Sequence, residues 1–100
     1  MANEHNDKDI SCFSYDELLN RAQQGWLIPG MVSEEQFWLL VGVSSMHSEK
    51  IISALMDYLV KGSSRRESCH IYHVNSGHFS IGLNRLQHIS NAAAKLSKFY

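Results

Sequence analysis

The chain has 100 residues, of which 44% are apolar and one is proline, so it can form one small domain whose core needs no disulfide or structural metal. Its polar N-terminus does not resemble a secretory signal, and its longest apolar run, residues 37–43, is too short to cross a bilayer, so we expect a cytoplasmic protein with reduced thiols and no membrane segment. The formal net charge is −1, so the total charge of the chain does not by itself indicate binding to nucleic acid or to a lipid surface.

The N-terminal part is expected to contain a disordered tail and then one helix. Residues 1–12 are polar without a hydrophobic period, which is typical of disorder, and residues 13–100 are expected to form one helical domain. Ser14 begins the sequence SYDE, a capping box that predicts a helix over 14–24 with a glycine at its end. Residues 26–30 are predicted to be an extended connector, because their proline keeps the preceding residue out of helical geometry.

Two helices are predicted in the middle of the chain. The sequence SEEQ, which starts at Ser33, is a second capping box and predicts a helix to about Val43. Apolar residues then recur with a period of about 3.6 over residues 48–61, which indicates an amphipathic helix, and Gly62 is a natural C-terminal stop. No strand alternation of useful length is visible, so we expect an all-helical fold.

The first of these helices carries five consecutive apolar residues, from Phe37 to Val41. A helix in a small domain buries only one face, so part of this run is expected to contact a second copy of the chain. The residues predicted for self-association are Phe37, Trp38, Leu39 and Val41. The sequence leaves open the alternative that the connector from Trp26 to Ile28 covers the same surface.

The C-terminal part predicts a helix-turn-helix over about residues 64–90. Ser64 is followed three residues later by Glu67, a further capping box for a helix to about His73, and Asn75 can cap the next helix. His73 then lies in the turn, where glycine is common. The side chains predicted to face inward are Cys69, Tyr72, Val74, Phe79 and Leu83.

A short final helix with a basic last turn is predicted over residues 92–100, because basic residues there suit the helix dipole. The sequence has no internal repeat or low-complexity segment. The predicted fold is therefore an all-α bundle of about five helices that contains a helix-turn-helix.

One cysteine and three histidines lie close together in residues 68–80, which raises the question of a metal site. Cys69, His70, His73 and His78 have spacings that could share a helix face. Structural zinc, however, usually draws close ligand pairs from two elements, and a zinc hydrolase needs a neighbouring Glu as general base. Neither condition is met, so we expect no metal, no cofactor and no catalysis, with Cys69 as a small packing residue.

Charge is divided unequally along the chain. Residues 1–60 contain three Lys and Arg against nine Asp and Glu, a net charge of −6, whereas residues 61–100 contain six against one, a net charge of +5. A basic half of this kind is typical of a polyanion-binding protein, although a merely solvated charged face gives the same pattern. Contact between the two halves of different copies would suit head-to-tail assembly.

Several segments, in order and spacing, resemble the PapB family of fimbrial (adhesin) operon regulators. They are FWLLVGVSSMHS (37–48), MDYLVKG (56–62), SRRESC (64–69), NSGHFS (75–80) and LNRL (83–86). The likeness covers roughly residues 27–100. It implies a small all-helical, oligomeric protein that binds double-stranded DNA at AT-rich repeated operator sites and controls transcription of fimbrial genes.

The candidate DNA contacts follow from placing the second helix of the motif in a DNA groove. Its outward residues would reach bases or sugars, and basic residues around it would lie over phosphates. The first set is Ser76, His78, Ser80, Ile81, Asn84 and Arg85, and the second is Lys61, Arg65, Arg66, His88 and Lys95. Few of these side chains are long and bidentate, so we expect affinity to come from phosphates and from several subunits, with DNA shape contributing specificity.

A protein-interaction module is the alternative function. In that case the apolar residues 37–43 bind a partner helix and the basic half is incidental. Ionic strength distinguishes the two functions, because DNA binding weakens steeply with salt and an apolar contact does not. Neither function involves a small-molecule substrate or a membrane.

Overall fold

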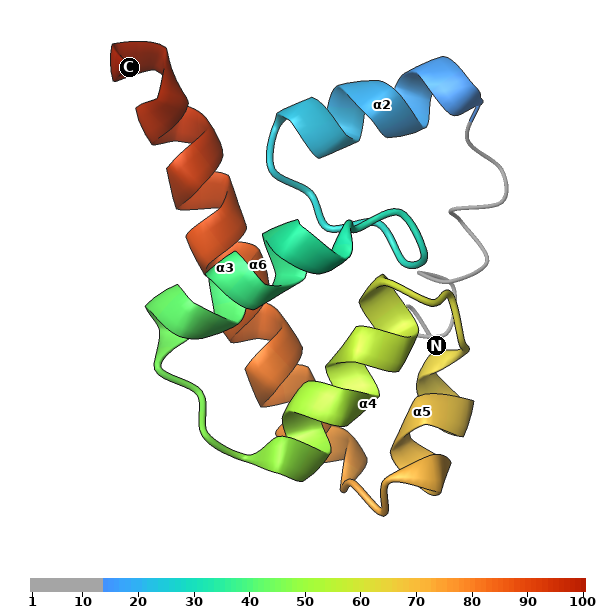
Figure 1. The fold of residues 1–100 in the computed structure, drawn as a ribbon. Coiled ribbons are helices and arrows are strands. Elements are labelled where there is room, and N and C mark those ends of the chain that lie inside the picture. Colours follow the sequence, from blue (N-terminus) through green and yellow to red (C-terminus); the bar gives the residue numbers. More distant parts are fainter. Residues whose placement is uncertain (1–13) are drawn as a thin grey trace.

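The computed structural model describes residues 14–100, and over this range it is built of helices with no strand. The elements are α2 (Tyr15–Gln23), α3 (Glu34–Ser44), α4 (Glu49–Leu59), α5 (Arg65–Ile71) and α6 (Ser76–Leu96), followed by the short 3-10 helix η1 (Ser97–Phe99). The long helix α6 packs against both α3 and α4, and α5 lies beside α4 (Figure 1). The prediction of an all-α fold of about five helices is confirmed, while the tail predicted over 1–12 lies outside the described residues.

A polar side chain caps the start of each of these five α-helices. The capping residues are Ser14, Ser33, Ser48, Ser64 and Asn75. At Ser14 the complete capping box forms, because Glu17 Oε1 also accepts a hydrogen bond from the Ser14 N–H at 2.9 Å. Caps of this kind contribute about 1 kcal/mol each. They are local sequence signals, which is why the predicted helix starts agree with the structure.

The core lies where α3, α4 and α6 meet. Its largest fully buried apolar side chains are Phe37, Leu55, Leu59, Phe79 and Leu86. The rings of Tyr58 and Phe79 meet edge to face, with 5.5 Å between centroids. A Cβ at Gly82 would lie 3.0 Å from Ile51 Cγ2, so the absence of a side chain there lets α6 lie close to α4.

The structure has one continuous helix where the sequence predicts two. The separate helix predicted over 92–100 is wrong, because α6 extends to Leu96 and then tightens into η1. Residues 87–96 contain neither glycine nor proline, and three consecutive alanines favour the helix. As a result α6 is about 31 Å long.

Two amide side chains of α6, here called the Gln87–Asn91 latch, hold the connector between α2 and α3. Gln87 accepts a hydrogen bond from the Leu27 N–H at 3.0 Å and donates to the Gly25 carbonyl at 2.9 Å and to Asn91 Oδ1 at 2.8 Å. Asn91 in turn donates to the carbonyl preceding Gly25 at 3.0 Å. Gly25 has a φ of +94° and its Cβ would lie 2.7 Å from an α6 carbonyl oxygen, so glycine alone fits this approach.

We expect Gln87→Ala to lower the free energy of unfolding by about 1–3 kcal/mol, because it leaves the Leu27 N–H and the Gly25 carbonyl without their partner. Urea unfolding followed by circular dichroism measures this difference. Gln23→Ala, on the exposed surface of α2, is the control and should change stability by less than about 0.5 kcal/mol. Equal stability of Gln87→Ala and the parent protein would contradict the latch.

Candidate nucleic-acid interface

The segment between α5 and α6 forms a tight turn. His73 has a φ of +55°, a left-handed conformation that histidine adopts more readily than most side chains. The Val74 N–H donates to the Cys69 carbonyl at 2.9 Å, and the Asn75 side chain then starts α6 by accepting from the N–H groups of Gly77 and His78. The arrangement is consistent with the predicted helix-turn-helix.

Two small residues of α5 lie inside this hairpin, and the sequence predicted one of them. The sequence predicts Cys69, but Ser68 is 0% exposed, whereas Cys69 is half-buried at the edge of the core. Cys69 thus packs against the core as predicted, and its neighbour Ser68 is the more deeply buried of the two. Burial raises the pKa of the Cys69 thiol, and the nearby Arg65 guanidinium acts in the opposite direction. A raised pKa favours the thiol over the nucleophilic and metal-binding thiolate.

One side of α6 is buried and the other is exposed. Phe79, Gly82 and Leu86 face the core. The exposed residues that the sequence selects, here called the α6 face, are Ser76, His78, Ile81, Asn84, Arg85 and His88. The structure thus brings six of the eleven candidate DNA contacts together on the exposed side of one helix, mostly at spacings of three and four residues.

Arg65 and Ser80, also selected from the sequence, face each other between α5 and α6. The Arg65 guanidinium donates a hydrogen bond to the Ser80 hydroxyl and lies over the Phe79 ring, 5.1 Å from its centroid. Both side chains are partly buried. This pair therefore ties the two helices of the hairpin together, in addition to any contact with DNA.

The remaining basic candidates are spread along the molecule. Arg66 is exposed at the start of α5. Lys61 follows the C-terminal end of α4 and pairs with Asp57 at 3.5 Å, while the opposite end of the same helix lies beside the α6 face. Lys95 lines a different hollow of about 610 Å³ together with His88. The structure therefore does not bring Lys61 and Lys95 close to the first turns of α6.

The loop between α3 and α4 adds residues that the sequence did not select. A hollow of about 300 Å³ lies between this loop and α6. His47 and Ser45 line it from the loop, and His78, Ile81 and Arg85 line it from α6. The sequence contained one indication of this loop, since its residues SSMHS belong to the first segment that resembles the PapB family. No local pattern, however, indicates that the loop lies against α6.

The apolar run of α3 is divided between the interior and the surface. Phe37 and Val41 are buried in the core of this chain. The prediction that these two residues contact a second copy is therefore wrong. Their spacing of four residues places them on the face of α3 that packs inward. Trp38, Leu39 and Val43 are exposed instead, and Val43 was not in the predicted set.

Two other features of the described residues concern partners. Over residues 14–100, no three His, Cys, Asp or Glu side chains gather in a way that could hold a metal ion. None of the helices in this range has both the length and the apolar character needed to cross a membrane.

Comparison with known proteins identifies the family. The PapB family, described as adhesin biosynthesis transcription regulatory proteins, matches residues 7–100 of the chain. The chain belongs to this family. The resemblance seen in the sequence is thereby confirmed.

Relatives in the PapB family are named as operon regulators. The major pilus subunit operon regulatory protein PapB of Escherichia coli is 47% identical over 83% of this chain and 79% of its own length. The AFA-III adhesin operon regulatory protein of Escherichia coli is 49% identical over 77% of this chain and 76% of its own length. The crystal structure of Escherichia coli FocB, 42% identical, matches with a TM-score of 0.71 over 87% of this chain and 99% of that one. The chain is therefore a transcription regulatory protein and not an enzyme.

We expect Arg65→Ala to lower the free energy of unfolding by about 1–2 kcal/mol, because it removes the donor to Ser80 and the cation over Phe79. Thermal and urea unfolding of the full chain measure the change. Arg66→Ala is the matched control, since its exposed neighbouring side chain has the same charge, and it should leave stability nearly unchanged. An equal loss in both variants would show that charge, and not the bridge, is responsible.

Proposed function

We propose that this member of the PapB family binds double-stranded DNA in the cytoplasm with its α6 face. The target is AT-rich repeated operator DNA of a fimbrial or adhesin operon, which it binds cooperatively as an oligomer. The observation that carries the proposal is the exposed α6 face, with Arg85 and Asn84 beside His78 and Ile81. The names of its relatives as operon regulatory proteins support the same function.

The chemistry of the α6 face suits A·T base pairs. Asn84 can donate to and accept from an adenine edge, and Ile81, which is largely exposed, can pack against a thymine methyl group. Both contacts belong to the major groove. Ser76 and His78 are short or single-point groups that discriminate weakly, so direct base readout is modest and DNA shape contributes the rest.

Phosphate contacts provide most of the affinity. Arg65 and Arg66 flank the α6 face, His88 lies at its end, and Arg85 can reach either a guanine edge or a phosphate. Lys61 and Lys95, at greater distances from the first turns of α6, contact phosphates further along the duplex. Cations at this many points predict a steep fall of affinity with salt.

Binding of several copies compensates for modest readout by each one. Trp38, Leu39 and Val43 leave an exposed apolar surface on α3, which is suited to self-association. When one copy occupies a site, its neighbour binds the next site at a raised effective concentration, without new base contacts. Repeated operator sites are the DNA arrangement that uses this gain.

The same exposed residues of α3 favour a second candidate function. A partner protein could lay an amphipathic helix against Trp38, Leu39 and Val43, and the chain would then act without contacting DNA. Such a complex depends weakly on salt, whereas DNA binding depends on it steeply. Titration at several ionic strengths separates the two.

Footprinting on DNA upstream of the chain's own gene, followed by titration of the protected site, tests the proposed function. We expect Arg85→Ala to reduce the preference for that site over random DNA by about 1–3 kcal/mol, because a group that reads bases is lost. Arg66→Ala should instead weaken binding to all sequences and reduce the salt slope by about one.

Arg85→Lys is the matched control, since it keeps the charge but loses the bidentate geometry. It should retain the salt slope and lose preference. If none of the three variants changes affinity, slope or preference, the α6 face does not contact DNA and the second candidate function is favoured.

A further inference from the structure

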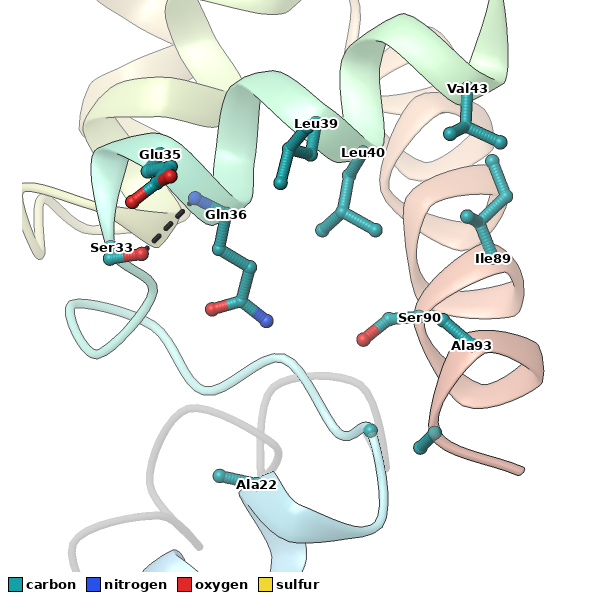
Figure 2. Close-up of a pocket in the computed structure, with 12 residues that line it drawn as sticks. Ala22, Ser33, Glu35, Gln36, Leu39, Leu40, Val43, Ile89, Ser90 and Ala93 are labelled. Atoms are coloured by element: carbon teal, nitrogen blue, oxygen red, sulfur yellow. Dashed lines mark hydrogen bonds between the residues drawn. The ribbon is translucent and has the colours of Figure 1, made fainter. Parts of the chain in front are cut away.

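A groove of about 530 Å³ lies between α2, α3 and the second half of α6. Figure 2 shows Leu39, Leu40 and Val43 of α3 on one side of it and Ile89 and Ala93 of α6 on another. Leu39 is 66% exposed and Val43 is 69% exposed. The lining is thus mainly apolar, and within the described residues no side chain covers these two.

An exposed apolar end lies further along the same helix. Leu96 is 54% exposed and Phe99 is 80% exposed, and the end of α6 projects away from the other helices (Figure 1). Ile89, Ala93 and Leu96 are four and three residues apart, so Leu96 continues the row that lines the groove. Because α6 runs without a break to Leu96 and η1 continues to Phe99, Phe99 lies roughly 10 Å beyond Ala93 along the helix. The end therefore cannot fold back into the groove of its own chain.

Charges at the two surfaces are opposite. Glu34 and Glu35 are exposed at the start of α3, where Glu35 lines the groove. Lys95 and Lys98 are exposed beside the apolar end of α6. The apolar end of α6 has basic residues beside it, and the apolar groove has acidic residues beside it. A second copy of the same chain is therefore complementary to the groove in both hydrophobicity and charge.

We propose that the Leu96–Phe99 end of one copy fills this groove in a second copy, with Lys98 facing Glu35. The inference rests on the proposed function, since it names the surface through which the DNA-binding oligomer assembles. The second half of α6 borders the groove and leads directly into the Leu96–Phe99 end, so two copies can exchange these contacts reciprocally. The result is a two-fold dimer in place of the open head-to-tail contact expected from the sequence.

This arrangement leaves the DNA-binding surface open. The α6 face ends at His88, and Leu96 lies about 12 Å further along the helix. Assembly and DNA binding therefore use successive parts of α6. Each dimer presents two α6 faces to DNA.

Sedimentation velocity of the full chain without DNA tests the proposal. The parent protein should form a dimer that dissociates on dilution. Phe99→Asp and Leu39→Asp should each weaken dimerisation about tenfold or more, because a charge enters an apolar contact. Ile71→Asp is the matched control, since Ile71 is 50% exposed on α5 and lies outside the groove, and it should dimerise like the parent.

The charge contact is tested by exchange. Glu35→Lys and Lys98→Glu should each weaken the dimer, and the chain carrying both changes should recover much of the loss, because opposite charges again face each other. Circular dichroism confirms that each variant keeps its helical content. If the chain carrying both changes dimerises no more strongly than either single variant, the proposed pairing of Lys98 with Glu35 is wrong.

Two further results would overturn the proposed interface: a parent that is monomeric at every concentration, or Phe99→Asp and Leu39→Asp proteins that dimerise like the parent. Binding to a single DNA site is measured on the same samples and separates this failure from that of the proposed function. Unchanged dimerisation with intact single-site binding refutes the interface alone. Dimerisation that responds as expected in a chain without DNA affinity supports the interface and refutes the proposed function.

Discussion

The packing of one side of α6 against α3 and α4 is the constraint on which the other features depend. Phe79 and Leu86 are fully buried there, and Gly82 allows the closest approach to Ile51 of α4. A Cβ at Gly82 would lie 3.0 Å from Ile51 Cγ2 and 3.3 Å from Leu55 Cδ1, so α4 leaves little room for a side chain at this point of α6. The positions of Asn84 and Arg85 toward solvent are thus consequences of core packing, since an α-helix fixes both sides at once.

Local signals in the sequence were sufficient for the helices and insufficient for their contacts. Serine and asparagine caps fixed where helices begin, and the predicted inward residues Phe79 and Leu83 do lie in or against the core. By contrast, the Gln87–Asn91 latch joins residues about 60 positions apart, and no local pattern marks it. Ser68 is buried more deeply than its predicted neighbour Cys69, and this depends on how α5 packs against the surrounding helices.

The apolar run of α3 also shows that the sequence does not determine which residues are free to contact a partner. Its composition indicated that some residues would face away from the core, and Trp38 and Leu39 do. Which members of the run are buried depends on how α3 sits on α6, so Phe37 and Val41 were assigned to the wrong side. Similarly, His47 adjoins the α6 face through a loop, and its proximity to Arg85 follows from the fold and not from spacing in the sequence.

The two halves of α6 are joined without a visible hinge. Buried contacts continue from Phe79 through Leu86 to Ser90, and the latch fixes the connector against the same stretch of helix. The described helix therefore offers continuous packing, and not a hinge, as the physical link between its two ends. If copies bind repeated DNA sites as proposed, cooperativity arises from tethering, in which a bound copy holds its partner near the next site. Its strength then depends on the spacing and helical phase of the repeated sites, because a rigid helix cannot bend to meet a site on the wrong side of the duplex.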